Sequence, residues 1–306
     1  MKIILHPKRK SLKWLIVALG TFDGVHRGHQ KILKRAVALA KKQGTAALAI
    51  TFDPHPQQLI VPERGLHLLT TIREREELFC QMGVDGVVVI NFAPRLQALN
   101  YREFVEKYLC KKLGIKHVVV GFDYAFGSGR AGDVNKLRKL VRKLGFAVEV
   151  VPAVKYRQHA IKSRLIREMV SRGQFGIALR WLGHPYPVSG KVVQGEGRGQ
   201  RLGFPTANLR VDSQKLVPAY GVYAGFACFC GKKYRCCVNI GAGPTFGVGT
   251  ATIEAHLIGF KGNLLGKSLK IYLSHRLRDE IHFSDVEELK RQIKRDITLA
   301  CRKVRV

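Results

Sequence analysis

The sequence has no long apolar run. No uninterrupted apolar stretch among its 306 residues reaches the roughly 20 residues that a membrane-spanning helix needs. Residues 1–13 are basic, but the apolar run that follows them is cut short by Gly20, so we expect no cleavable signal sequence. These absences argue against a helical membrane protein and against a secreted one.

The cysteines show no framework of pairs. Their number is seven and they form no C-x-x-C motif, which fits a reducing compartment, and we expect a cytoplasmic protein. Four of them, Cys228, Cys230, Cys236 and Cys237, are close in sequence. These thiols could bind zinc, but their spacing does not match zinc knuckles. Their strand-like surroundings favour small buried hydrophobic side chains instead.

Acidic residues are scarce. The chain has 22 acidic against 53 basic residues, a formal net charge of +31, and the excess is spread over both halves. Such a field attracts polyanions, which include nucleotides, nucleic acid and anionic membrane surfaces. Composition does not choose among these partners, and a generally basic proteome would produce the same charge without any function.

The first half alternates strand-like and helix-like segments. Gly44 is expected to end the first helix, and Asp133 is expected to cap the fourth. Continuous apolar strands between amphipathic helices predict a parallel sheet covered on both faces. The predicted strands are 15–19, 45–52, 86–92, 117–121 and 147–154, and the predicted helices are 30–42, 74–82, 101–113 and 134–144.

The pattern changes in the second half. Residues 163–182 predict two short helices broken near Gly173, and 184–187 read as a linker between domains. Beyond it, short alternating runs separated by glycine turns are typical of an antiparallel barrel or sandwich. These runs are 190–194, 221–230, 233–240, 251–258 and 267–273. Residues 285–302 predict a docked amphipathic helix, with Val286, Leu289, Ile293 and Ile297 on one face.

The stretch Gly20–His29 is the strongest local signal. It holds three glycines and two histidines between a predicted strand and a predicted helix. Free backbone N–H groups and the positive end of the helix dipole make such a turn an anion site. His26 and His29, three residues apart, can donate hydrogen bonds to phosphate oxygens. The alternative is a capped surface turn with incidental histidines.

Further motifs follow in a fixed order along the chain. In the first half they are 20–29, 51–56, 121–133 and 161–167. In the second half they are 195–199, 202–208, 221–223, 239–241 with Pro244-Thr245-Phe246, Glu254 with His256, and Leu277-Arg278 with Phe283. Together they resemble the bacterial bifunctional riboflavin kinase/FMN adenylyltransferases, also called FAD synthetases, over nearly the whole chain.

The resemblance implies an α/β protein of two domains. Residues 1–183 would form a Rossmann-like FMN adenylyltransferase (nucleotidyltransferase) domain with a parallel sheet. Residues 184–306 would form a riboflavin kinase domain, an antiparallel β-barrel with a terminal helix. The implied function is ATP-dependent phosphorylation of riboflavin to FMN, followed by adenylylation of FMN to FAD with release of pyrophosphate. ATP would be the co-substrate of both steps and Mg²⁺ the cofactor.

In the kinase half, the resemblance implies that Glu254 is the general base for the riboflavin hydroxyl. Thr206 and Asn208 would supply hard oxygen ligands for Mg²⁺. The remaining implied nucleotide-binding residues are Gly195, Gly197, Arg198 and Gly203. The alternative for Glu254 is a solvated strand carboxylate paired with a basic neighbour.

In the adenylyltransferase half, the attacking group is already an anion, so positioning and charge neutralisation suffice. The resemblance implies that His26, His29 and Arg167 do this work. The implied nucleotide-binding residues are Gly20, Phe22, Asp23, Gly28, Asp123 and Ser163. Asp123 could instead only cap a turn.

The chain departs from the family pattern in the first half. Lys162 and Arg164 stand where the family has hydroxyl side chains, and Ala125 stands where an arginine is common. A riboflavin kinase with weakened or lost adenylyl transfer is therefore the nearer alternative. A basic nucleic-acid-binding protein on a nucleotidyltransferase-like scaffold is the more distant one, since only the charge favours it. The sequence predicts no oligomeric state.

Overall fold

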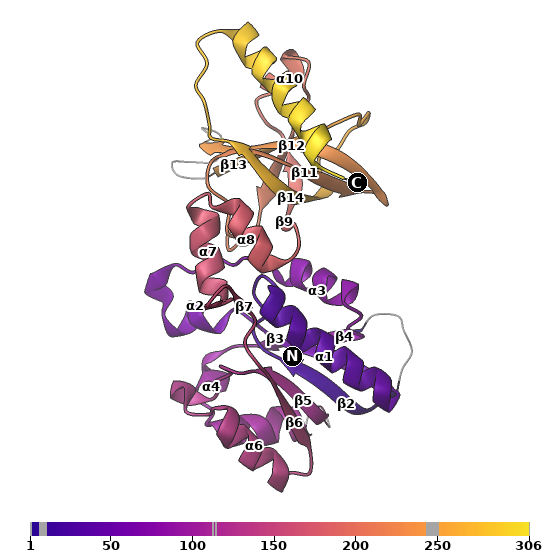
Figure 1. Ribbon diagram of the computed structural model, residues 1–306, viewed down its shortest axis with the longest axis vertical. Coiled ribbons are helices and arrows are strands. Elements are labelled where there is room, and N and C mark those ends of the chain that lie inside the picture. The colour runs from indigo at the N-terminus through magenta and orange to yellow at the C-terminus, as the bar shows by residue number, and fades with distance from the viewer. Residues whose placement is uncertain (1, 6–10, 112, 114, 243–250, 306) are drawn as a thin grey trace. The chain divides into compact units, whose positions relative to one another are not determined.

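The computed structural model describes residues 2–5, 11–111, 113, 115–242 and 251–305. The chain forms two compact units. The first comprises Met1–Leu66 with Arg75–Lys162, and the second comprises His67–Glu74 with Ser163–Val306. Figure 1 shows both, with many of their helices and strands labelled. In the part of the chain described, no helix has the length and apolar character needed to cross a bilayer.

A six-stranded sheet forms the centre of the first unit, in the order β1-β4-β3-β2-β5-β6. Its strands are β1 Lys2–Leu5, β2 Ser11–Leu19, β3 Thr45–Asp53, β4 Gly86–Asn91, β5 Ile115–Gly121 and β6 Ala147–Val151. Strands β2 to β6 pair in parallel, and β1 runs antiparallel to β4. The predicted parallel α/β sheet is confirmed, whereas the short edge strand β1 was not predicted.

Helices and short turns connect these strands. They are α1 Arg27–Gln43, α2 Pro56–Ile60, η1 Pro62–Arg64, α3 Ile72–Gln81, α4 Pro94–Gln97, α5 Tyr101–Phe104, η2 Val105–Lys111, η3 Ser128–Arg130 and α6 Val134–Lys143, with the hairpin β7 Lys155–Tyr156 and β8 His159–Ala160. Gly44 ends α1 with a left-handed φ of 65°, and Asp133 caps α6 by accepting from the Lys136 backbone N–H, as predicted. The predicted helix over 101–113 is an α-helical turn followed by the π-helix η2; Gly114, its expected end, lies outside the described residues.

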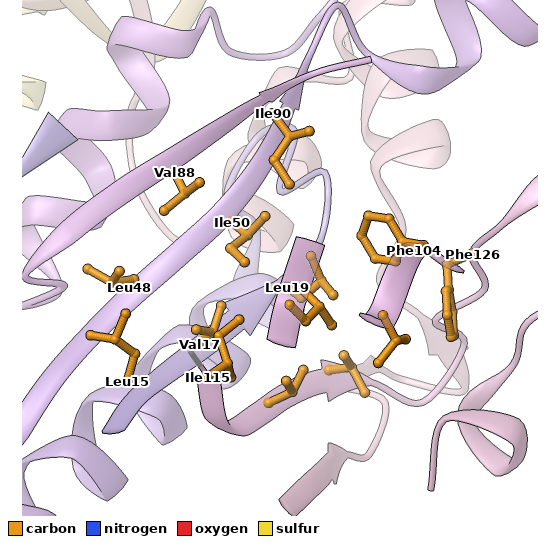
Figure 2. Packing of buried hydrophobic residues seen from close by; sticks show 14 of the residues in the cluster. Leu15, Val17, Leu19, Leu48, Ile50, Val88, Ile90, Phe104, Ile115 and Phe126 are labelled. Carbon is orange, nitrogen blue, oxygen red and sulfur yellow. The ribbon is translucent and has the colours of Figure 1, made fainter. Parts of the chain in front are cut away.

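Both faces of this sheet are covered. Figure 2 shows the apolar side chains of β2, β3, β4 and β5 gathered on one face, together with Phe104 and Phe126. Leu137 and Val141 of α6 complete this cluster. Helix α1 packs against β2, β3 and β5. A sheet buried on two sides explains why its strands are continuous apolar runs rather than alternating ones.

The second unit is built on a closed six-stranded barrel, in the order β10-β13-β12-β11-β14-β9. Its strands are β9 Tyr186–Val193, β10 Ala207–Val211, β11 Gly221–Phe229, β12 Lys232–Ala242, β13 Ala251–Leu257 and β14 Ser268–Arg278, and every pairing is antiparallel. Its helices are α7 Ser163–Ser171, α8 Phe175–Leu182, α9 Arg198–Arg201 and α10 Val286–Lys303. Of the two predicted architectures, barrel and sandwich, the structure has the barrel.

The expected linker at 184–187 is wrong in its second half. Strand β9 begins at Tyr186, which is fully buried, and the Tyr186 hydroxyl donates to the Leu216 carbonyl oxygen over 2.7 Å. Pro187 pairs with Tyr272 of β14. Strand β10 was not predicted, although its five residues alternate between apolar and polar side chains.

The terminal helix α10 docks on β11 and β12, as Figure 1 shows. Its predicted apolar face is only partly right, because Val286 at the first turn is 56% exposed. The contact is made by Ala300 and by Val304, just beyond the helix, which pack with Ala224 and Cys237, and the predicted Ile297 packs against the same cluster. Cys236 is fully buried as well, so the small-hydrophobe interpretation holds for the adjacent pair, while Cys230 is exposed.

Candidate active sites

Three motif-bearing loops of the first unit follow neighbouring parallel strands. Gly20–His29 follows β2, residues 54–56 follow β3, and residues 122–133 follow β5. Strand β2 lies between β3 and β5 in the sheet. The chain therefore leaves β2 toward β3 and β4 and later returns to pair β5 on the other side. Ligands of open α/β sheets bind where the strand order reverses in this way.

The turn after β2 holds two non-glycine residues in the left-handed region. Phe22 has φ of 51° and Val25 has φ of 39°, with Gly24 at 80° between them. Each such non-glycine residue costs on the order of 1–3 kcal/mol and persists only where its surroundings hold it. The side chains of Phe22 and Val25 are 1% and 0% exposed, so the core of the unit holds the turn in this conformation.

His26 and His29 come together as the spacing predicted. His26 is the N-cap of α1, and its Nδ1 accepts from the His29 backbone N–H over 3.3 Å. The two rings stack, with centroids 3.6 Å apart, and Phe22 packs edge-on against His29 at 5.3 Å. Since Nδ1 of His26 is an acceptor, its neutral ring carries the proton on Nε2, which is therefore the atom able to donate to an anion.

Two glycines of this turn pack closely against aromatic rings. A Cβ on Gly28 would lie 3.0 Å from Cε1 of His26, and a Cβ on Gly20 would lie 3.2 Å from the Phe22 ring. A side chain at either position would therefore require that ring to shift by a few tenths of an ångström.

The other predicted residues of the first half lie on different elements. Asp123 is exposed, two residues beyond the end of β5. Ser163 and Arg167 lie on α7, which belongs to the second unit. Arg164, one of the departures from the family, forms an exposed ion pair with Glu168 at 2.6 Å.

In the second unit, polar residues of three neighbouring strands lie in register. Glu254 of β13 is paired with Asn208 of β10 on one side and with Asn239 of β12 on the other. Directly opposed residues place their side chains on the same face of a sheet. The three side chains therefore form a row across the barrel wall. Asn208 and Glu254 were predicted as site residues, and Asn239 was recognised only as part of a motif.

Thr206 lies just before β10 and joins this row. Its Oγ1 donates to Oε2 of Glu254 over 3.5 Å. Burial raises the pKa of the Glu254 carboxyl, and Glu196 adds to the rise, while Thr206 and Arg198 oppose it. A carboxylate with a raised pKa is a stronger base than an exposed one. This environment differs from that of a solvated strand carboxylate.

The glycine-rich segment between β9 and β10 is packed against this row. A Cβ on Gly195 would overlap the Asn208 side chain, and one on Gly199 would lie 2.5 Å from the Phe204 carbonyl oxygen. Gly197 and Gly203 have left-handed φ values of 69° and 87°. Arg198 is exposed and its Nε lies 2.7 Å from a Glu196 carboxylate oxygen. The motif Pro244-Thr245-Phe246 lies outside the described residues.

The donor atoms beside Glu254 suit Mg²⁺. Thr206 offers a hydroxyl oxygen and Asn208 an amide oxygen, and hard oxygen donors are what this cation prefers. The close fit of Gly195 against Asn208 holds that amide beside the glycine-rich segment, where phosphates would lie. The residues present therefore fit the cofactor that the sequence suggested.

Sequence reasoning missed Arg75 of α3, which is 1% exposed. It contacts the turn after β2 through Thr21 and Asp23. A charged residue in an amphipathic helix is normally expected on the solvent side. The pattern Glu74 to Glu77 carries no signal that singles out Arg75.

A histidine-bearing turn at the start of a helix, placed at the switch point of a parallel sheet, and a barrel carboxylate of raised pKa beside hard oxygen donors are features that suit enzymes transferring the phosphate groups of ATP. Two family models match the chain one after the other, FAD synthetase over residues 8–165 and riboflavin kinase over residues 182–304. The chain belongs to the family of bifunctional riboflavin kinase/FMN adenylyltransferases.

Curated relatives match this chain over most of its length. The bifunctional riboflavin kinase/FMN adenylyltransferase of Pseudomonas fluorescens is 34% identical over 297 residues, covering 97% of this chain and 95% of the relative. The Escherichia coli (strain K12) protein of the same name is 34% identical over 282 residues, covering 92% and 90%. A solved structure described as a macrolide-efflux protein from Streptococcus pneumoniae has a TM-score of 0.84 and 30% identity, covering 99% of this chain and 96% of that chain.

Proposed function

We propose that this chain makes FAD from riboflavin in two ATP-dependent steps, with one step in each half. The observation that carries the proposal is the presence of both matched families on one chain, 8–165 and 182–304. In function we assign residues 1–183 to FMN adenylyl transfer and 184–306 to riboflavin phosphorylation. Because ATP and flavin are metabolites of the cell interior, we assign the protein to the cytoplasm.

In the kinase step, Glu254 takes the proton of the riboflavin 5′-hydroxyl. The oxygen forms a bond to the γ-phosphorus of ATP as the bond between that phosphorus and the β–γ bridging oxygen breaks, and ADP leaves. Thr206 orients the Glu254 carboxylate through the 3.5 Å contact. Gly195, Gly197 and Gly203 let the backbone lie against the nucleotide phosphates, and Arg198 adds positive charge.

Mg²⁺, when bound by Thr206 and Asn208, supplies neutralisation of phosphate charge. Thr206 lies just before β10, and Asn208 is the second residue of that strand, opposite Glu254 in the barrel. The same short segment therefore serves the base and the cation.

In the adenylyltransferase step, an oxygen of the FMN phosphate attacks the α-phosphorus of ATP and pyrophosphate leaves. His26 and His29 donate hydrogen bonds to the ATP phosphates from the start of α1, where the helix dipole also favours anions. The turn from Gly20 to Gly28, with Phe22 and Asp23, shapes this site. We assign Asp123 and Ser163 to the nucleotide and Arg167 to a phosphate group, by their match to the family motifs.

A kinase that has lost adenylyl transfer is the second candidate. It is favoured by the exposed Arg164, which is ion-paired with Glu168 and cannot accept a hydrogen bond as a hydroxyl does. The two candidates differ in a product, since the first makes FAD and the second stops at FMN.

The test is incubation of the protein with riboflavin, ATP and Mg²⁺, followed by chromatographic separation of FMN and FAD. The expected result is accumulation of both. The Glu254→Gln variant should form no FMN from riboflavin but should still convert supplied FMN to FAD. The His29→Ala variant should form FMN but should not convert it to FAD. FMN without FAD in the wild-type protein would establish the second candidate. Loss of both activities in either folded variant would contradict the assignment of one step to each half.

A further inference from the structure

We propose that Arg75 is the positioning residue of the adenylyltransferase site, holding the turn after β2 in its strained conformation through Thr21 and Asp23. The inference rests on the proposed adenylyl transfer and adds a residue to it. Arg75 is an interior guanidinium: its side chain is 1% exposed, and the Asp23 side chain is fully buried.

The contacts of Arg75 converge on the first residues of the turn. The Nη1 atom of Arg75 donates to the Thr21 carbonyl oxygen over 2.8 Å and to Oγ1 of Thr51 over 3.0 Å. Thr51 in turn donates from Oγ1 to the same Thr21 carbonyl over 2.8 Å. The second Nη lies 3.9 Å from a carboxylate oxygen of Asp23.

These contacts lie on both sides of Phe22, one of the two strained residues of the turn. Phe22, with φ of 51°, lies between Thr21 and Asp23, and Val25, with φ of 39°, follows. A strained segment persists only when its surroundings determine it. Arg75 contacts the residue on each side of Phe22. The Phe22 ring itself packs against His29 and Phe79.

The charge balance supports the same role. The guanidinium of Arg75 and the carboxylate of Asp23 are both buried, and their separation of 3.9 Å lets each offset part of the desolvation cost of the other. A fully buried carboxylate is in a poor position to contact a nucleotide. Asp23 therefore acts on the phosphate site through Arg75 and the backbone rather than as a ligand.

Lysine cannot replace Arg75 in full. The planar guanidinium reaches Thr21, Thr51 and Asp23 from two different nitrogens, whereas an ammonium is a single compact donor group. Arg75→Lys keeps the charge that Asp23 needs but loses part of the fork, so it should lie between the wild type and Arg75→Met.

The decisive measurement is hydrogen exchange by mass spectrometry on full-length Arg75→Met and Arg75→Lys, read on peptides covering Gly20–His29. This readout does not require catalysis. Exchange in the turn should be at least about tenfold faster in Arg75→Met and intermediate in Arg75→Lys, while peptides of β11 and β12 should be unchanged. Arg35→Met, which removes an exposed ion pair with Glu149 in the same unit, is the matched control and should leave the turn unchanged.

Kinetics provide the second readout. Arg75→Met should raise the KM for ATP and lower kcat in FMN adenylylation, with riboflavin phosphorylation by the same preparation within twofold of wild type. Unchanged exchange in the turn of Arg75→Met, or an equal rise in exchange throughout the chain in both variants, would overturn the proposal. If the wild-type protein makes no FAD, the proposed function fails, but the exchange result still decides the role of Arg75.

Discussion

Oγ1 of Thr206 lies 3.5 Å from Oε2 of Glu254, although 48 residues separate them in the sequence. The pairing of β10 with β13 brings them together, since Asn208 and Glu254 are directly opposed. A hydroxyl from a glycine-rich segment thus meets the carboxylate of a barrel strand. This relationship makes the acidity of Glu254 adjustable by its neighbours, from which the first prediction follows.

The rate of riboflavin phosphorylation should fall in acid at a higher pH than an ordinary glutamate would give. The base is the ionised form, and burial raises the pKa of Glu254, so protonation removes the base as pH falls through that raised value. Thr206 lowers this pKa and Glu196 raises it. The acid limb of kcat/KM against pH should therefore move up in Thr206→Val and down in Glu196→Gln. If the acid limbs of the two variants moved in the same direction, the assignment of Glu254 as the general base would be contradicted.

Thr206→Val should also raise the Mg²⁺ concentration that the kinase step requires. Valine has nearly the shape of threonine without the hydroxyl oxygen that we assign to the cation. We expect at least about a tenfold rise in the Mg²⁺ concentration for half-maximal FMN formation. The control is Thr252→Val, which removes a hydroxyl that donates to the Gly241 carbonyl of the same barrel. An equal rise in both variants would exclude a specific role for Thr206.

Gly28→Ala should impair FMN adenylylation and spare riboflavin phosphorylation. The new methyl group would lie 3.0 Å from Cε1 of His26, so the ring must move from its stacked position on His29. We expect adenylylation to fall by up to about tenfold, less than the roughly hundredfold that a displacement of about 1 Å can cost, because the ring needs to move by only a few tenths of an ångström. Gly176→Ala is the control, because a Cβ at Gly176 meets nothing within 4 Å. Full activity of Gly28→Ala would show that the stacked rings are not needed.

Asp296→Asn should lower the stability of the second unit. Asp296 of α10 is buried and accepts from Nε and Nη2 of Arg278 over 2.8–3.2 Å. The amide leaves the guanidinium without its counter-charge, at a cost of about 2–4 kcal/mol in the free energy of unfolding. Urea unfolding followed by circular dichroism measures it.

The control for Asp296→Asn is Asp279→Asn. Asp279 pairs with Arg276, but its side chain is 81% exposed. Exposed pairs contribute about 0–1 kcal/mol, so this variant should unfold near the wild-type midpoint. Equal losses in the two variants would mean that burial of the Arg278–Asp296 pair has no effect.

The sequence was sufficient for most of the regular structure. Apolar runs such as 45–52 and end signals such as Gly44 and Asp133 act within a few residues, so they can be interpreted without the fold. Strand β10 was not predicted although its residues alternate between apolar and polar side chains, and the proline-flanked Tyr186 shows no local pattern that separates a strand from a linker. Their place is set by partners elsewhere in the barrel, Val192 for Leu209 and Leu273 for Tyr186.

By itself, the sequence determined the family, the alternation of the first half, and the turn that presents His26 and His29 at the start of a helix, because each depends on residues adjacent in the chain. Only the tertiary structure decided that Thr206 meets Glu254 and that Arg75 is buried against Asp23. Those contacts join residues 48 and 52 positions apart, and a long-range contact leaves no period or cap in the local sequence. For the same reason the burial of Arg75 could not be predicted from the sequence, because a cation is expected at the surface unless the fold places an anion beside it.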